Sequence, residues 1–270
     1  MADAHGNARV LIVAGSDSGG GAGIQADLKA VMALGGYGAT AITALTAQNT
    51  VGVQSVHPVP PPFIAEQMAS VLDDIGADCI KTGMLHDVPV IDAVVRELDE
   101  RAAGIPVVVD PVMVSQSGHR LITDDAAHRL QAELLSRATV LTPNLPEAEV
   151  LLGRSIDGHD AMVKAAEALL ELGPGAVLLK GGHAPGADVL DVLATPAGVE
   201  RFEAPRLEVT STHGTGCTLA SAVAAGIAQG MTVRDAVVRG RAYLHEALRT
   251  SRPLGHGAGP VNHAHTVKPF

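Results

Sequence analysis

Tryptophan is absent from this 270-residue chain, and three phenylalanines and two tyrosines are its only large aromatic side chains. Positive charge is also scarce: 19 basic against 29 acidic residues give a formal charge of −10. Proteins that bind nucleic acids by base stacking and phosphate contacts need aromatic side chains and a basic surface. We therefore expect no nucleic-acid partner. An anionic small molecule could still bind at a local site made of backbone amides, a few basic side chains and a metal ion.

Cysteine is almost as rare, since only Cys79 and Cys217 occur and no CxxC pair exists. Zinc-finger and thioredoxin-like chemistry are therefore not indicated. The apolar stretches are interrupted by glycine, proline or aspartate before the roughly 18 residues that a membrane span needs, and residues 1–9 lack the apolar core of a signal peptide. These features predict a soluble, cytoplasmic protein with no membrane partner.

Apolar residues make up 47% of the chain, enough for a large core. Short, continuously apolar runs alternate with segments of helical period. The predicted strands are Val10–Ala14, Ala39–Leu45, Cys79–Lys81, Pro106–Val109, Thr139–Leu141 and Ala176–Leu179, followed by a hairpin of Val189–Ala194 and Glu200–Phe202. The predicted helices are Ala22–Leu34, Phe63–Ile75, Val88–Leu98, Thr123–Leu135, Pro146–Leu152, Asp160–Leu172, Cys217–Gln229 and Val233–Arg249. This order predicts the α/β class, with a mostly parallel central sheet and helices on both faces. We expect a single domain over residues 9–250, with tails at 1–8 and 251–270.

Ligands of such sheets bind beyond the carboxyl ends of the strands, and the first strand is followed by a glycine-rich loop, residues 15–23. The loop either presents amides to a phosphate or ligand, or it is a tight turn needed for packing. A Walker A motif is excluded because none of the five lysines follows a glycine. No acidic residue stands where a dinucleotide-binding fold would hold a ribose.

Two later junctions suit an anion. Lys180 ends an apolar run and precedes Gly181 and Gly182. Farther on, two glycines precede a predicted helix, so the amides of Thr215, Gly216 and Cys217 could point at one anion at the positive end of the helix dipole. We expect that position to lower the pKa of the Cys217 thiol; the alternative is a buried, inert cysteine.

Acidic and amide side chains follow two more strands. Asp110 comes after Pro106–Val109, and Asn144 and Glu147 come after Thr139–Leu141. Carboxylates at two neighbouring strand ends could hold Mg²⁺ directly or through water. Asn144 and Glu147 equally fit the start of a capped helix, so both interpretations of Glu147 stay open.

Together these junctions resemble the hydroxymethylpyrimidine/phosphomethylpyrimidine kinase family of thiamine biosynthesis, in the ribokinase-like superfamily. The resemblance runs from about Val10 to His263 and rests on seven stretches in order: AGSDSGGGAGIQADLK at 14–29, TALTAQNT at 43–50, KTGML at 81–85, DPVM at 110–113, TPNLPEAE at 142–149, LKGGH at 179–183 and HGTGCT at 213–218. The tail sequence GPVNH at 259–263 is also similar to the family's ending.

The resemblance implies a single-domain ribokinase-like fold and a kinase that uses ATP twice. It would phosphorylate the hydroxymethyl group of 4-amino-5-hydroxymethyl-2-methylpyrimidine and then extend the monophosphate to the diphosphate. Carried over to this chain, the substrate side would comprise Gly15, Asp17, Ala22, Asp27, Thr46, Gln48, Met84 and Val112, with Gln48 at the ring edge. The ATP side would comprise Asn144, Lys180, Thr212, Gly214 and Gly216.

For catalysis the resemblance implies Cys217 as the base, with Lys180 and the loop of Gly214, Thr215 and Gly216 around the transferred phosphoryl group. It implies Mg²⁺ near Asp110 and Glu147, is compatible with a monovalent cation such as K⁺, and suggests a homodimer. A cysteine-containing pyridoxal kinase is the alternative, because its substrate is also an aromatic heterocycle with a CH₂OH group. One departure is the segment 114–119, which lacks the lysine that relatives often carry and should bring less positive charge to the phosphates.

Overall fold

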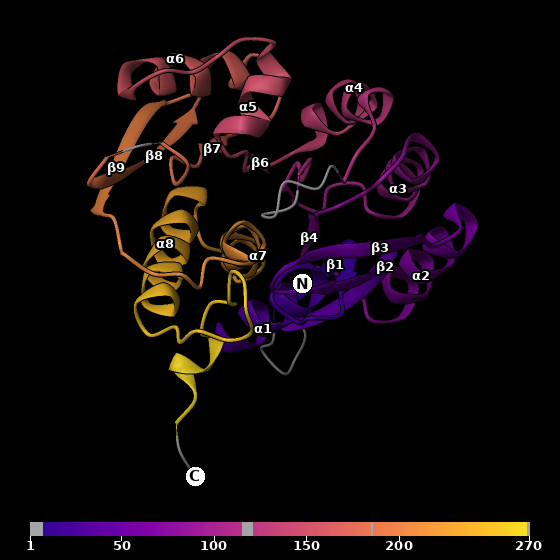
Figure 1. The fold of residues 1–270 in the computed structure, drawn as a ribbon. Coiled ribbons are helices and arrows are strands. Elements are labelled where there is room, and N and C mark those ends of the chain that lie inside the picture. Colours follow the sequence, from indigo (N-terminus) through magenta and orange to yellow (C-terminus); the bar gives the residue numbers. More distant parts are fainter. Residues whose placement is uncertain (1–7, 115–120, 185, 269–270) are drawn as a thin grey trace.

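The computed structural model describes residues 8–114, 121–184 and 186–268. Its strands form one sheet in the order β3-β2-β1-β4-β5-β6-β7-β8-β9 (Figure 1). Strands β2, β1, β4, β5, β6 and β7 are mutually parallel, and β3, β8 and β9 add antiparallel edges. The bounds are Arg9–Asp17 (β1), Tyr37–Asn49 (β2), Gly52–Pro58 (β3), Cys79–Thr82 (β4), Val107–Val109 (β5), Val140–Leu141 (β6), Val177–Leu179 (β7), Asp188–Thr195 (β8) and Gly198–Pro205 (β9).

Helices cover both faces of the sheet, because its central strands are apolar on both sides. One core joins the sheet to α2 (Pro61–Asp74), α3 (Val88–Arg101), α4 (Asp124–Glu133), α5 (Leu145–Leu152) and α6 (His159–Leu170). The other joins it to α1 (Gly23–Ala33), α7 (Thr215–Ala228) and α8 (Val233–Arg249). Two short 3₁₀ turns, η1 (Leu135–Arg137) and η2 (His263–Thr266), complete the described elements. The predicted α/β class and the helices on both faces are confirmed.

The largest difference from the sequence prediction lies at one edge of the sheet. Strand β2 continues to Asn49, past the predicted end at Leu45, and turns into the unpredicted strand β3. β3 is mostly exposed and mixes valines with polar residues, so it carries no clear apolar signal. The extension matters for function because it places Thr46 beside Asp17, the last residue of β1, and carries Gln48 beyond that end.

The segment from Gly259 to Thr266 packs against the body of the protein. The His213 amide donates to the Gly259 carbonyl at 3.0 Å, and Val261 is buried. The turn η2 contacts α1 and α8. Of the helices within the described ranges, none is long and apolar enough to cross a membrane.

Candidate active site

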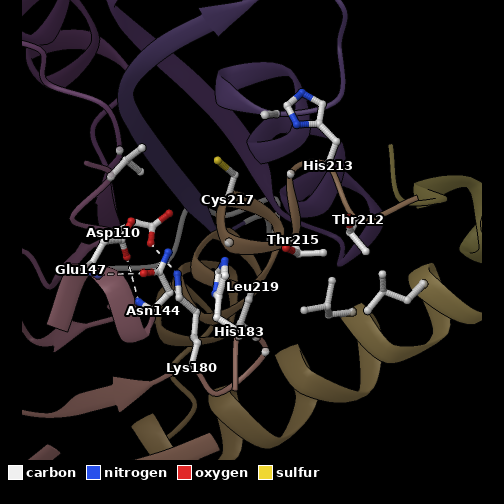
Figure 2. Close-up of a pocket in the computed structure, with 18 of the residues that line it drawn as sticks. Asp110, Asn144, Glu147, Lys180, His183, Thr212, His213, Thr215, Cys217 and Leu219 are labelled. Carbon is white, nitrogen blue, oxygen red and sulfur yellow. Dashed lines mark hydrogen bonds and ion pairs between the residues drawn. The ribbon is translucent and has the colours of Figure 1, made fainter. Parts of the chain in front are cut away.

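One cavity of about 1020 Å³ lies at the carboxyl ends of the parallel strands, against the start of α7 (Figure 2). The crossover connections between the parallel strands bring residues from distant parts of the sequence to the carboxyl-end edge of the sheet. Of the predicted site residues, the cavity is lined by Gly15, Asp17, Ala22, Thr46, Gln48, Met84, Asp110, Val112, Asn144, Glu147, Lys180, Thr212, Gly214, Thr215, Gly216 and Cys217.

The start of α7 is built for close approach. Gly214, at the N-cap position, has a left-handed φ of 82°, and a Cβ there would collide with the Gly21 carbonyl oxygen. Glycine is therefore required at this position. No described side chain caps this helix start. The Thr215 amide donates to the Thr212 carbonyl at 3.4 Å, so the amides of Gly216 and Cys217 are the ones left for a ligand, at the positive end of the dipole.

Lys180 supplies a cation beside that helix start. It is buried, and its ammonium donates to Asp110 Oδ1 at 2.9 Å. A Cβ on Gly216 would lie 3.2 Å from Lys180 Nζ and 3.8 Å from Asp110 Oδ2. The lysine, the carboxylate and the amides at the start of α7 thus face one small volume; Figure 2 shows the side chains of Lys180 and Asp110 close together.

Glu147 has the capping role that the sequence left open. Glu147 Oε2 accepts from the Asn144 amide at 2.8 Å, and Asn144 Oδ1 accepts from the Glu147 amide at 2.9 Å, which forms a complete capping box. Burial raises the pKa of Glu147 to about 7; the Lys180 charge opposes this shift and the Asp110 charge adds to it. The Met113 amide also donates to the Glu147 carboxylate. Capping does not exclude a metal role, because each carboxylate oxygen has more than one acceptor position.

The expected activation of Cys217 is wrong for the ligand-free protein. Burial raises the pKa of its thiol to about 12 instead of lowering it. The Lys81 charge opposes this rise, as does the Gly23 amide that donates to the sulfur, whereas the charges of Asp27 and Asp110 reinforce it. Desolvation is the largest cause of the rise, and together with the two carboxylates it outweighs the Lys81 charge and the Gly23 amide.

The prediction that Asp27 belongs to the substrate side is also corrected, since Asp27 does not line the cavity. It is completely buried, accepts from Lys81 Nζ at 3.0 Å on both carboxylate oxygens, and accepts from Ser221 Oγ at 2.6 Å. Lys81, which the sequence interpretation left without a role, is the partner that reaches the cavity. The signal for it was present: like Lys180, it stands at the carboxyl end of an apolar strand.

The glycine-rich loop after β1 is a tight turn and not an open phosphate cradle. The Asp17 carboxylate accepts hydrogen bonds from three amides of this loop. Oδ1 accepts from Gly19 at 2.8 Å, and Oδ2 accepts from Gly21 at 3.0 Å and from Ala22 at 2.8 Å. These bonds support the tight-turn interpretation and argue against a phosphate held by the same amides. Gly15, Asp17 and Ala22 nevertheless line the cavity, so contact between this loop and a substrate stays a prediction.

His213 is a second residue without an assigned role in the sequence interpretation. Its Nε2 lies 3.0 Å from Asp17 Oδ2 and 3.1 Å from the side-chain amide of Gln48. It joins the end of β1 to the extended part of β2. A polar ring directly before the glycine of the anion loop was the available signal.

Helix α8 contributes a wall that sequence reasoning missed. The cavity's apolar side includes Leu219 of α7 and four residues of α8, Val238, Ala242, Leu244 and Leu248. The helical spacing of apolar residues predicts that one face of α8 is apolar. It does not predict that part of this face borders a cavity.

Residues 115–120, which include most of the segment without the expected lysine, lie outside the described residues. Elsewhere in the described chain, no group of three or more histidine, cysteine or acidic side chains could hold a metal ion by itself. Any ion here would need other ligands besides Asp110 and Glu147.

An α/β sheet with a lysine, uncapped helix amides and two carboxylates around one cavity defines a protein of the phosphoryl-transfer class. Residues 17–262 match the family described as phosphomethylpyrimidine kinase, and the chain belongs to that family. It is 47% identical to the hydroxymethylpyrimidine/phosphomethylpyrimidine kinase of Rhizobium meliloti, over 94% of this chain and 96% of that protein. It is also 51% identical to the thiamine biosynthesis bifunctional protein ThiED of Geobacter sulfurreducens, over 94% of this chain but only 52% of that longer protein.

Among solved structures, an ADP complex of Bacillus subtilis pyridoxal kinase superposes with a TM-score of 0.88 at 36% identity. The superposition covers 96% of this chain and 98% of the pyridoxal kinase. Relatives of this chain thus bind adenine nucleotides in the same fold.

Proposed function

We propose that this chain is a kinase of thiamine biosynthesis. It transfers a phosphoryl group from ATP to the hydroxymethyl oxygen of 4-amino-5-hydroxymethyl-2-methylpyrimidine, and a second one to the resulting monophosphate. Family membership over residues 17–262 supports the activity. The observation that carries it is the position of Lys180 and the amides of α7 in the same cavity as Gln48, Met84 and Val112.

The phosphates of ATP would bind between Lys180 and the amides of Gly216 and Cys217. Phosphoryl transfer depends mainly on positioning and charge neutralisation, and both are available at a helix start beside a buried ammonium. The apolar wall from α8 suits the flat base of the nucleotide, and Thr212 and Asn144 also line the cavity.

Mg²⁺ fits the pair of Asp110 and Glu147. The raised pKa of Glu147 reflects a buried carboxyl group next to another negative charge, and a divalent cation would relieve that repulsion. Mg²⁺ commonly uses one or two carboxylates and completes its shell with water and substrate phosphates. Bound there, it would neutralise charge on the phosphates; the residues themselves hold and orient it. A bound K⁺ remains a further prediction from the resemblance.

The first transfer needs a base for the hydroxyl proton, and Cys217 is the candidate at the start of α7. Its thiol is neutral in the ligand-free protein. Proton removal by Cys217 therefore depends on the two groups that lower the pKa of the thiol, the Lys81 charge and the Gly23 amide. The second acceptor is a phosphate, which is already anionic and needs no proton removed. A single cavity can therefore serve both steps.

Phosphorylation of pyridoxal is the second candidate, favoured by the superposition on a pyridoxal kinase. Both substrates carry a CH₂OH group on an aromatic ring, so the same transfer geometry serves either. A homodimer and a cytoplasmic location also remain predictions.

The test is ATP-dependent turnover of the hydroxymethylpyrimidine with pyridoxal in a parallel reaction, and with monophosphate and diphosphate products resolved. Diphosphate from the pyrimidine is the expected result. Monophosphate alone would reduce the proposal to a one-step kinase, turnover of pyridoxal alone would replace it with the second candidate, and no turnover of either would refute both.

A further inference from the structure

A chain of polar contacts runs across the substrate side of the cavity from Asp17 through His213 to Gln48. His213 Nε2 is the shared atom, 3.0 Å from Asp17 Oδ2 and 3.1 Å from the nearer amide atom of Gln48. The other amide atom of Gln48 lies 3.2 Å from Thr46 Oγ1, and Thr46 Oγ1 donates to the Ser16 carbonyl at 2.9 Å.

Asp17 determines which atoms of this chain carry hydrogens. Burial alone would raise the pKa of Asp17, but donation from His213 and from the amides of Ala22 and Gly19 outweighs it and leaves that pKa below its usual value. Asp17 is therefore ionised at neutral pH and can only accept. His213 Nε2 must then carry a hydrogen, whether the ring is neutral or protonated.

This hydrogen decides the orientation of the Gln48 amide. The oxygen and nitrogen of a side-chain amide have the same shape, so their assignment follows from their partners. An N–H of His213 requires the Gln48 oxygen beside it, and the Gln48 nitrogen then donates to Thr46 Oγ1, whose own hydrogen is already given to Ser16. In this orientation the single Nε2 hydrogen is shared between Asp17 Oδ2 and the Gln48 oxygen, and each contact pairs a donor with an acceptor. The orientation assigned in the structure, with the Gln48 nitrogen beside His213 and the Gln48 oxygen beside Thr46, would set two donors 3.1 Å apart.

The His213 ring is itself held in place. Its backbone amide is bonded to Gly259, and its side chain is only 12% exposed. The ring packs so closely on Gly21 that a Cβ at that position would overlap it. The ring cannot easily turn away to release Gln48.

Each amide atom of Gln48 keeps one free hydrogen-bonding position, so the side chain can present a fixed acceptor and donor pair to a ring edge. The pyrimidine carries an amino group, a donor, beside the carbon with the hydroxymethyl group, and next to it a ring nitrogen, an acceptor. Pyridoxal carries an aldehyde oxygen, an acceptor, and next to it a hydroxyl that can donate. The two substrates therefore match opposite orientations of one amide.

We propose that His213, oriented by Asp17, is a positioning residue that fixes the Gln48 amide in the orientation that selects an aminopyrimidine edge over the edge of pyridoxal. This inference rests on the proposed function, because it concerns the choice between its two candidate substrates. It assigns His213 no role in the transfer itself.

The test compares two substitutions that differ by one methylene group. His213→Gln places an N–H close to the position of the histidine Nε2, and His213→Asn cannot reach it. We expect His213→Asn to raise KM for the pyrimidine and to lower the ratio of kcat/KM for pyrimidine over pyridoxal about tenfold, the usual effect of one hydrogen bond. The saturating kcat for the pyrimidine should change much less. His213→Gln should restore the ratio, and substitution of the exposed His128 on α4 by Asn is the matched control.

A measurement on the unsubstituted protein makes the outcome independent of how the variants fold. Nitrogen-15 NMR of the histidine rings should show a protonated Nε2 in His213 at neutral pH, and an unprotonated Nε2 would overturn the proposal. An unchanged substrate ratio in His213→Asn would overturn it as well, while normal pyrimidine turnover would leave the proposed function standing. If the unsubstituted chain phosphorylates neither substrate, the proposed function fails, whereas the NMR result still reports on the hydrogen-bond chain.

Discussion

Removing Lys81 should destabilise the protein severely, although the residue lies beside the cavity. Lys81 and Asp27 are fully buried, and the ammonium lies 3.0 Å from both carboxylate oxygens. Without the lysine, the Ser221 hydroxyl would be the one hydrogen-bond partner left to Asp27 among the described side chains. Leaving one member of a buried pair uncompensated costs about 3–5 kcal/mol. For a chain of this length, a loss of that size lowers Tm by about 5–9 °C.

The assay is thermal unfolding of Lys81→Met and of the double variant Asp27→Asn/Lys81→Met. The double variant removes both charges and keeps the Ser221 hydrogen bond, so most of the stability should return. As a surface control, Arg101→Met removes an exposed ion pair with Asp73 and should have a much smaller effect. If Lys81→Met unfolds like the unsubstituted protein, or if the double variant is as unstable as the single one, the uncompensated charge is not the cause.

The pH dependence sharpens this prediction. Burial raises the pKa of Asp27, and Lys81 opposes that rise, so the pKa rises further in Lys81→Met. A carboxyl group with a raised folded-state pKa takes up a proton on folding, so stability falls as pH rises from its unfolded value, about 3.9, through the folded one. The deficit of Lys81→Met should therefore be larger at pH 8 than at pH 5, and the double variant should show no such trend.

Three further predictions concern the cavity. Cys217→Ala should slow the first phosphorylation far more than the second and leave ATP binding intact; equal losses in a product-resolved assay would remove its role as the base. Gly216→Val should abolish ATP binding measured by calorimetry, because the added side chain would crowd Lys180 Nζ, 3.2 Å from a Cβ; unchanged affinity would exclude this helix start as the phosphate site. Glu147→Gln keeps an acceptor for the Asn144 amide but removes the charge. The folded pKa of Glu147 is about 7, against about 4.3 in the unfolded chain. The unsubstituted protein without metal should therefore lose stability between about pH 5 and 8 relative to Glu147→Gln, and Mg²⁺ with ATP should raise the Tm of the unsubstituted protein more than that of the variant. Tm values that change in parallel for both proteins across this pH range would contradict the prediction.

Several parts of the fold follow from local patterns. Continuously apolar runs predicted the parallel strands, and helical period predicted α1 to α8 within a few residues, because these signals are carried by neighbouring side chains. Strand β3 was missed, since an exposed edge strand is held by pairing with β2 and not by burial of its own residues. No local signal reports a pairing partner.

The candidate site divides along the same line. The residues of the anion site could be chosen from sequence, because strand ends, glycines and a lysine mark Lys180, Gly214 and Gly216 locally, and the rule of carboxyl ends gathers them. The pKa of Cys217 could not, because it depends on desolvation and on charges brought from β4, α1 and the loop after β5.

The sequence by itself determined the fold class, the family and the residues of the anion site, since periodicity and linked motifs are written along the chain. Only the tertiary structure decided what those residues do to each other. In the structure Asp27 pairs with Lys81 instead of lining the cavity, and Asp17 accepts hydrogen bonds from the amides of its own loop. His213 lies between Asp17 and Gln48. The physical reason is that hydrogen bonds and ionisation depend on distances of about 3 Å between groups up to 196 positions apart in the chain, which no local pattern encodes.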